Sequence, residues 1–203
     1  MNVYSSEIPL PKLGRHAGKS RRPANKNINK ALRTAGALGI VAFAVFLVWQ
    51  IPVAATWEAH VAAWWLNPLL EKGVTSHGPY YLVWIDPDRL IAFNVTSECS
   101  AVVLIAPLLV VGAFFILSQR VSWLRGLAGI VSMLVIVIVT NQARLGLIAW
   151  ATQTWGISPG YEISHRLVGS LLGIAGFIAS LIALILVSGL RRARTVKEEG
   201  GLP

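Results

Sequence analysis

The sequence predicts an all-α membrane protein: a four-transmembrane-helix bundle with an outer interfacial helix and a short β-hairpin before the second span. The first observation behind this prediction is composition. Of 203 residues, 55% are hydrophobic and 13% are charged, whereas about a quarter are charged in soluble domains. The second is that four uncharged stretches of 18 to 24 residues interrupt the chain. Because a bilayer span needs about 20 mostly apolar residues, each stretch can cross a membrane.

The placement of the basic residues predicts the orientation of this bundle. Of the 18 Lys and Arg residues, eight precede the first uncharged stretch, two lie between the second and third, and four follow the last. Cytoplasmic loops of membrane proteins are enriched in Lys and Arg. We therefore expect a multi-pass protein of the cell membrane with both termini in the cytoplasm. The net charge of +9 is then explained by topology and by membrane lipid, and no nucleic-acid partner is expected.

The elements follow from the charge-free stretches and the polar segments between them. Residues 1–33, with eight basic residues and three prolines, predict a disordered basic cytoplasmic tail. Residues 34–190 should form the membrane-embedded core, and 191–203 a second basic cytoplasmic tail. The predicted spans are about 35–55, 99–117, 127–144 and 165–190. The outer loops are then 56–98 and 145–164.

The first outer loop should contain two elements. A helix is expected from Thr56, which can cap it, with Glu58 in its positive first turn. Its three tryptophans favour the membrane interface, where indole rings settle. The turn signature Asp86–Arg89 lies between two runs rich in β-branched and aromatic residues, which predicts a hairpin. Its second strand leads the chain to Cys99.

Three chemically capable side chains are expected at one membrane depth. By this topology Cys99 lies at the outer end of the second span, Arg144 at the outer end of the third and His165 at that of the fourth. Each alone has a plain explanation, as a small packing residue, a snorkelling cation or a solvated histidine. Asn141 shares a helix face with Arg144. His165 heads a stripe of small residues that favours close helix packing, which comprises Gly169, Gly173, Gly176 and Ser180.

These groups together predict acyl transfer through a thioester. Cys99 is the only cysteine, and a thiol reacts when it is ionised, which the positive end of the second span and Arg144 would favour. His165 can act as general base and acid, and Arg144 can alternatively stabilise an oxyanion. Glu98 and Glu162 are candidates to orient His165. The spacing of histidines and cysteine fits no metal site, and no cofactor is expected.

The arrangement resembles the exosortase/archaeosortase family of membrane transpeptidases. The matching pieces are Glu98-Cys99-Ser100 entering a span, Asn141-Gln142-Ala143-Arg144 ending one, and His165 with Gly169 starting the last. The resemblance covers roughly residues 60–180. It departs from the family at Ala101, where many members have glycine, and in its four spans, where members commonly have more.

The resemblance implies a function. Such enzymes recognise exported proteins that end in a short motif, a transmembrane helix and a basic cluster, cleave near the motif and transfer the new carboxyl end to an acceptor. It makes Cys99 the nucleophile, His165 the acid and base, and Arg144 the partner of the oxyanion or thiolate.

Two other interpretations of the sequence remain. In the first, the chain is a non-enzymatic assembly or secretion subunit that binds partners through its outer hairpin and Trp-rich helix. In the second, it is a redox or carrier protein that uses its single thiol with a partner thiol.

Overall fold

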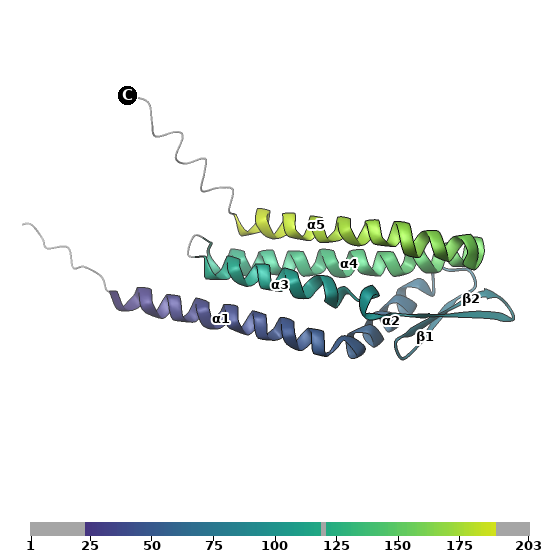
Figure 1. Cartoon of the computed structure of the whole chain (residues 1–203), viewed down its shortest axis with the longest axis horizontal. Helices are drawn as coiled ribbons and strands as arrows, with labels where there is room; N and C mark the ends of the chain where they lie inside the picture. The colour runs from purple at the N-terminus through teal and green to yellow at the C-terminus, as the bar shows by residue number, and fades with distance from the viewer. Residues whose placement is uncertain (1–22, 119–120, 190–203) are drawn as a thin grey trace, which may run out of the picture.

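The computed structural model describes residues 23–118 and 121–189. Four long helices lie side by side, and a shorter helix and a small sheet cover one end of them (Figure 1). The helices are α1 (Pro23–Trp49), α2 (Ile51–Leu66), α3 (Ala101–Leu117), α4 (Trp123–Trp155) and α5 (Gly169–Ser188). The strands are β1 (Val74–His77), β2 (Tyr80–Asp86) and β3 (Arg89–Asn94). Short helical turns cover Ser97–Cys99, Gly156–Tyr161 and Ile163–Val168.

Among the residues that the structure describes, three helical segments are long and apolar enough to cross a membrane, which makes this a membrane protein with several candidate spans. They are Asn27–Trp49, Trp123–Ser158 and Ile163–Ser188. The second predicted span, 99–117, corresponds to α3, whose 17 residues extend about 26 Å at 1.5 Å per residue. That is slightly less than the roughly 30 Å of a bilayer core, so the count of four spans remains a prediction.

The predicted N-terminal tail is too long, because α1 begins before its expected boundary. Residues 23–33 are helical, while 1–22 and the predicted tail at 191–203 lie outside the described residues. Arg33 explains the order of this segment. Its guanidinium donates to the backbone oxygens of Ile116 at 3.2 Å, Ser118 at 2.7 Å and Val121 at 2.9 Å. These bonds satisfy carbonyls where α3 ends and tie α1 to that end.

The prediction of a second outer loop at 145–164 is wrong over residues 145–155, which are helical. α4 continues as a helix to Trp155, because Leu145, Ile148, Ala149 and Thr152 recur at helical spacing and are all buried. The same stretch holds the sheet, since Gln153 Nε2 donates to the backbone oxygen of Trp84 at 2.8 Å. Gln153 and Thr154 are therefore the sheet-binding and exposed positions of a longer helix.

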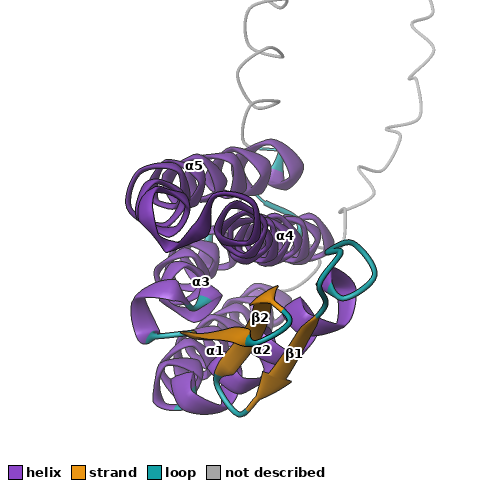
Figure 2. Ribbon diagram, turned by 90° about the vertical axis from the view of Figure 1, so that its right-hand side faces the viewer, coloured by secondary structure: helices purple, strands orange, loops and turns teal. Residues whose placement is uncertain are grey.

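The predicted hairpin is present as β2 and β3, and a third strand extends it. The sheet is antiparallel in the order β1-β2-β3, with Val74 opposite Val83 and Tyr81 opposite Phe93. β1 was missed because its polar sequence, Val74–His77, has only one buried residue. The sheet packs on α2 at one end of the bundle (Figure 2). Because β3 stands last in the strand order, it is an edge strand.

α2 begins five residues earlier than predicted. It starts at Ile51 directly after Gln50, with proline at its second position, so Thr56 lies inside the helix and Glu58 lies in its middle. The tryptophans do not share one environment: Trp57 and Trp64 are exposed, whereas Trp65 donates through Nε1 to Gln142 Oε1 at 2.9 Å. The interfacial position of this helix remains a prediction.

Glycine permits the close contact between α4 and α5. A Cβ at Gly176 would lie 2.4 Å from Thr140 Cγ2, and one at Gly129 would lie 2.6 Å from Ser188 Oγ. The predicted stripe of small residues is thus only partly an interface, because a Cβ at Gly173 would meet no atom within 4 Å.

Candidate active site

Cys99 ends a short turn that leads into α3. The turn covers Ser97–Cys99, and the Cys99 N–H donates to the Thr96 oxygen at 2.9 Å. Ser100 is the cap of α3, and its hydroxyl accepts from the Val102 N–H at 3.3 Å. Cys99 therefore lies just before the helix and not in its first turn. Its side chain is only 6% exposed.

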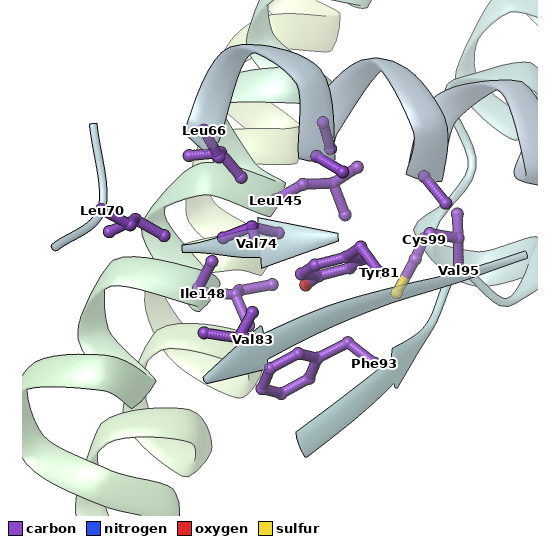
Figure 3. Packing of buried hydrophobic residues seen from close by; sticks show 14 of the residues in the cluster. Leu66, Leu70, Val74, Tyr81, Val83, Phe93, Val95, Cys99, Leu145 and Ile148 are labelled. Atoms are coloured by element: carbon purple, nitrogen blue, oxygen red, sulfur yellow. The ribbon is translucent and has the colours of Figure 1, made fainter. Parts of the chain in front are cut away.

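The thiol stands at the edge of a buried cluster formed by α2, the sheet and α4. Figure 3 shows the Cys99 sulfur beside the ring of Tyr81. Burial raises the pKa of the Tyr81 phenol above its usual value, and the nearby Cys99 charge acts in the same direction. Tyr81 therefore remains a protonated neighbour of Cys99 at neutral pH.

Arg144 reaches this turn from α4. Its Nη2 lies 3.9 Å from Cys99 Sγ, and its Nη1 lies 3.5 Å from the backbone oxygen of Glu98. The prediction that Arg144 ends a helix is wrong, since α4 continues for 11 more residues. Its depth still fits, because Arg144 lies about 32 Å along α4 from Trp123 at 1.5 Å per residue, close to the roughly 30 Å thickness of a bilayer core.

His165 lies in a wide, π-type helical turn, Ile163–Val168, that leads into α5. Such turns are frequent at functional sites. The His165 ring stacks on Tyr161 with centroids 5.1 Å apart and planes at 9°. Tyr161 in turn contacts Phe93 at 5.5 Å. A row of aromatic rings that starts at Phe93 on β3 thus ends at the ring of His165.

Two cavities meet at Cys99 and His165, and both residues line each of them. The first has a volume of about 330 Å³ and is mostly apolar, between β3, α4 and the turn around Tyr161. The second, of about 410 Å³, lies between α3 and α5 and is lined also by Glu98, Arg144 and Arg166. The structure therefore brings the three predicted site residues, Cys99, Arg144 and His165, to one place.

Of the three residues predicted to support the site, only Glu98 lines one of the two cavities. Glu98 lines the second cavity and is exposed. Glu162 is exposed and lines neither cavity. Asn141 is buried one helical turn before Arg144, and its Nδ2 donates to Glu58 Oε2 at 3.1 Å. It lines neither of the two cavities.

Sequence reasoning missed Glu58 as a member of this region. Besides the bond from Asn141, its carboxylate accepts from the Ser100 hydroxyl at 2.9 Å and from the Ala101 N–H at 3.0 Å. Burial raises the pKa of Glu58 from 4.5 to about 7, although the hydrogen bonds from Ser100, Ala101 and Asn141 oppose the shift. The sequence feature that could have identified Glu58 is its position as the single acid in a helix of mostly small and aromatic residues.

The Glu58 carboxyl predicts a pH-dependent stability. Because its pKa is higher in the folded protein than the ordinary 4.5, the folded state binds this proton more tightly than the unfolded state. Its contribution to stability is therefore largest below pH 4.5 and declines as pH rises through about 7. Thermal unfolding in detergent should show this decline in the wild type. Glu58→Gln should lack it, and identical pH slopes in the two proteins would contradict it.

These contacts change the account of thiol activation. The first N–H groups of α3 are taken by Ser100 and Glu58, so the helix end is not free to stabilise a Cys99 thiolate. Arg144 is the cation next to the sulfur, with Nη2 3.9 Å from Sγ. The arrangement suits a nucleophilic thiol, an imidazole that moves its proton, and a guanidinium that holds the negative charge.

Gly169 supplies a test of this geometry. A Cβ at position 169 would lie 2.9 Å from the Ser164 oxygen and 3.1 Å from Arg144 Nε, so Gly169→Ala must displace the turn that carries His165, or Arg144 itself. We expect cleavage of a substrate to fall about 10- to 100-fold, since small misplacements at a reacting site have effects of this size. The matched control is Gly39→Ala on α1, where a Cβ meets nothing within 4 Å. Equal activity of both variants would contradict the close packing at Gly169.

Comparison with known proteins agrees with the early resemblance. A family model described as transmembrane exosortase matches residues 28–191, which is most of the chain and includes both cavities. No curated protein and no solved structure matches the chain.

Proposed function

The chain belongs to the transmembrane exosortase family, and from this premise we propose that it is a membrane cysteine transpeptidase or protease. Its substrates would be exported proteins, cleaved at a C-terminal sorting signal made of a short motif, a span and a basic cluster. The single observation that carries the proposal is the meeting of Cys99, Arg144 and His165 at one cavity. A nucleophile, a proton carrier and a fixed cation are the parts that acyl transfer needs.

The proposed reaction has two steps. His165 accepts the Cys99 proton as the sulfur attacks the scissile carbonyl carbon, and Arg144 receives the oxyanion. His165 then returns the proton to the leaving amine, the C–N bond breaks, and a thioester remains on Cys99. In the second step His165 removes a proton from the acceptor nucleophile, which attacks the thioester, and the proton passes to the departing sulfur.

The two cavities support a direction for the bound peptide. A peptide that crosses the thiol has one half on each side of Cys99, and a cavity lies on each side. The apolar cavity beside the edge strand β3 suits an extended motif. The cavity between α3 and α5 opens along two apolar helices, which suits the start of the substrate's transmembrane segment.

The proposed topology has four spans, both termini in the cytoplasm and the site on the outer face. The depth of Arg144 along α4 and the basic residues near the opposite end of the bundle support it. In a Cys99→Ser background, Glu71→Cys, an exposed position near the sheet, should react with an impermeant thiol reagent in intact cells. Arg125→Cys, at the beginning of α4, should react only after the membrane is opened. The reverse pattern would overturn the orientation.

The function is tested with a tagged exported protein that ends in a short motif, one span and Arg or Lys residues, chosen from the same proteome. Co-expression should shorten this protein at its C-terminal signal, as measured by mass spectrometry. Hydroxylamine should release an acyl fragment from the thioester on the enzyme. If none of these proteins is cleaved, and if partner proteins bind the chain through the sheet and α2, the non-enzymatic interpretation is favoured instead.

A further inference from the structure

Glu58 connects three elements that meet beneath the candidate nucleophile. It projects from the middle of α2, accepts from Ser100 and Ala101 where α3 begins, and accepts from Asn141 on α4. The Ala101 N–H approaches both carboxylate oxygens, at 3.0 and 3.2 Å. One side chain thus holds the chain immediately after Cys99 and the helix face that carries Arg144.

The Glu58 carboxylate is surrounded by neutral hydrogen-bond donors and is not paired with a basic side chain among the described residues. Its side-chain bonds come from a hydroxyl, a backbone N–H and an amide, and each of these donates. Within residues 23–118 and 121–189, the one ion pair joins Lys72 to Asp86, far from this site in the fold. An acceptor-only group that receives three or more donors is well matched in hydrogen bonds, which offsets part of the cost of burying it.

The backbone of Glu58 takes part as well. Gln142 Nε2 donates to the Glu58 carbonyl oxygen at 3.4 Å, while the Gln142 oxygen accepts from Trp65 at 2.9 Å. The segment Asn141-Gln142-Ala143-Arg144 therefore has two roles. Its first two residues fix α4 to α2, and its last reaches the Cys99 turn.

We propose that Glu58 is a positioning residue, whose carboxylate holds the Cys99 turn and the Asn141 face of α4 in the register that brings Cys99 Sγ to Arg144. The inference rests on the proposed cysteine chemistry and adds a residue to it. Glu58 lines neither of the two cavities at Cys99 and bonds to Ser100, Ala101 and Asn141, so it acts through these residues. Removing the carboxylate leaves the start of α3 without this acceptor and lets the turn move relative to Arg144.

The test compares Glu58→Gln with the matched control Glu71→Gln, whose side chain is exposed in the loop before β1. The amide of Glu58→Gln keeps the size of the carboxylate but turns one acceptor into a donor that faces other donors. We expect kcat for cleavage of the tagged exported protein to fall about 10- to 100-fold with KM little changed, because misplacement affects the reacting groups and not the binding cavities. Glu71→Gln should match the wild type.

A second readout separates positioning from simple loss of fold. Cys99 is the only thiol, so its alkylation by iodoacetamide in the folded, monodisperse protein reports the turn directly. Glu58→Gln should change this rate several-fold at an unchanged helical content, and Glu58→Asp, which is one methylene shorter, should give an intermediate rate. Wild-type kcat and alkylation in folded Glu58→Gln would overturn the inference. If Cys99→Ala also cleaved the substrate, the proposed function would fail instead.

Discussion

Cys99→Ala should abolish cleavage, lowering the rate by about 1000-fold or more, as expected when a covalent nucleophile is removed. Cys99 holds the only sulfur nucleophile of the chain, at the junction of two cavities and beside Arg144. The substitution should barely disturb the fold, since alanine removes one atom from the edge of a buried cluster, at a cost of about 1 kcal/mol. Thermal unfolding and helical content check this point.

Cys99→Ser gives a stricter version of the same test. It retains the shape of the side chain and can hydrogen bond to Arg144, but a hydroxyl is far harder to ionise than a thiol, so an alkoxide should not form at neutral pH. We expect no thioester and no hydroxylamine-sensitive fragment from either variant. Full processing by both would exclude the thioester mechanism and leave the non-enzymatic interpretation, in which changes to the hairpin matter more than changes to Cys99.

The spans could be predicted because they depend on a single physical quantity. Uncharged length decides whether a helix fits a bilayer, and the stretches bounded on one side by Arg33, Arg144 and Arg166 were visible without any tertiary information. The end of α4 could not be placed this way. Beyond Arg144 the helix is held by its contacts with α2 and the sheet, as the bond from Gln153 to Trp84 shows. A polar stretch that serves as a docking face resembles a loop in sequence.

The candidate site was likewise predictable in its membrane depth but not in its supporting contacts. A membrane fixes depth, so topology alone could bring Cys99, Arg144 and His165 to one level although they are far apart in sequence. It could not reveal what holds them there. Glu58 was placed in the first turn of a separate interfacial helix, and its partners Ser100 and Asn141 lie 42 and 83 residues away. Only the packing of α2 against the start of α3 makes that carboxyl part of the site.

Arg144→Ala should lower cleavage about 100- to 1000-fold, the range seen when one donor to a developing oxyanion is removed. Arg144→Lys should not restore the rate. The guanidinium fork approaches the Glu98 oxygen and the Cys99 sulfur with two different nitrogens, whereas an ammonium offers one centre at the end of a flexible stem. Arg125→Ala, at the opposite end of α4, is the matched control and should retain activity. Wild-type kcat in Arg144→Ala would exclude a role in the reaction.

The same variant decides which charge Arg144 stabilises. If Arg144 stabilises negative charge on the sulfur, alkylation of Cys99 at a fixed pH should be slower in Arg144→Ala than in the wild type, because the cation beside the sulfur is gone. If it serves only the oxyanion, alkylation should proceed at the wild-type rate while cleavage falls. The geometry favours the first outcome, since Nη2 already lies 3.9 Å from Sγ in the free protein. The first N–H groups of α3 are occupied by Ser100 and Glu58, which leaves Arg144 as the donor beside the sulfur that can stabilise negative charge there.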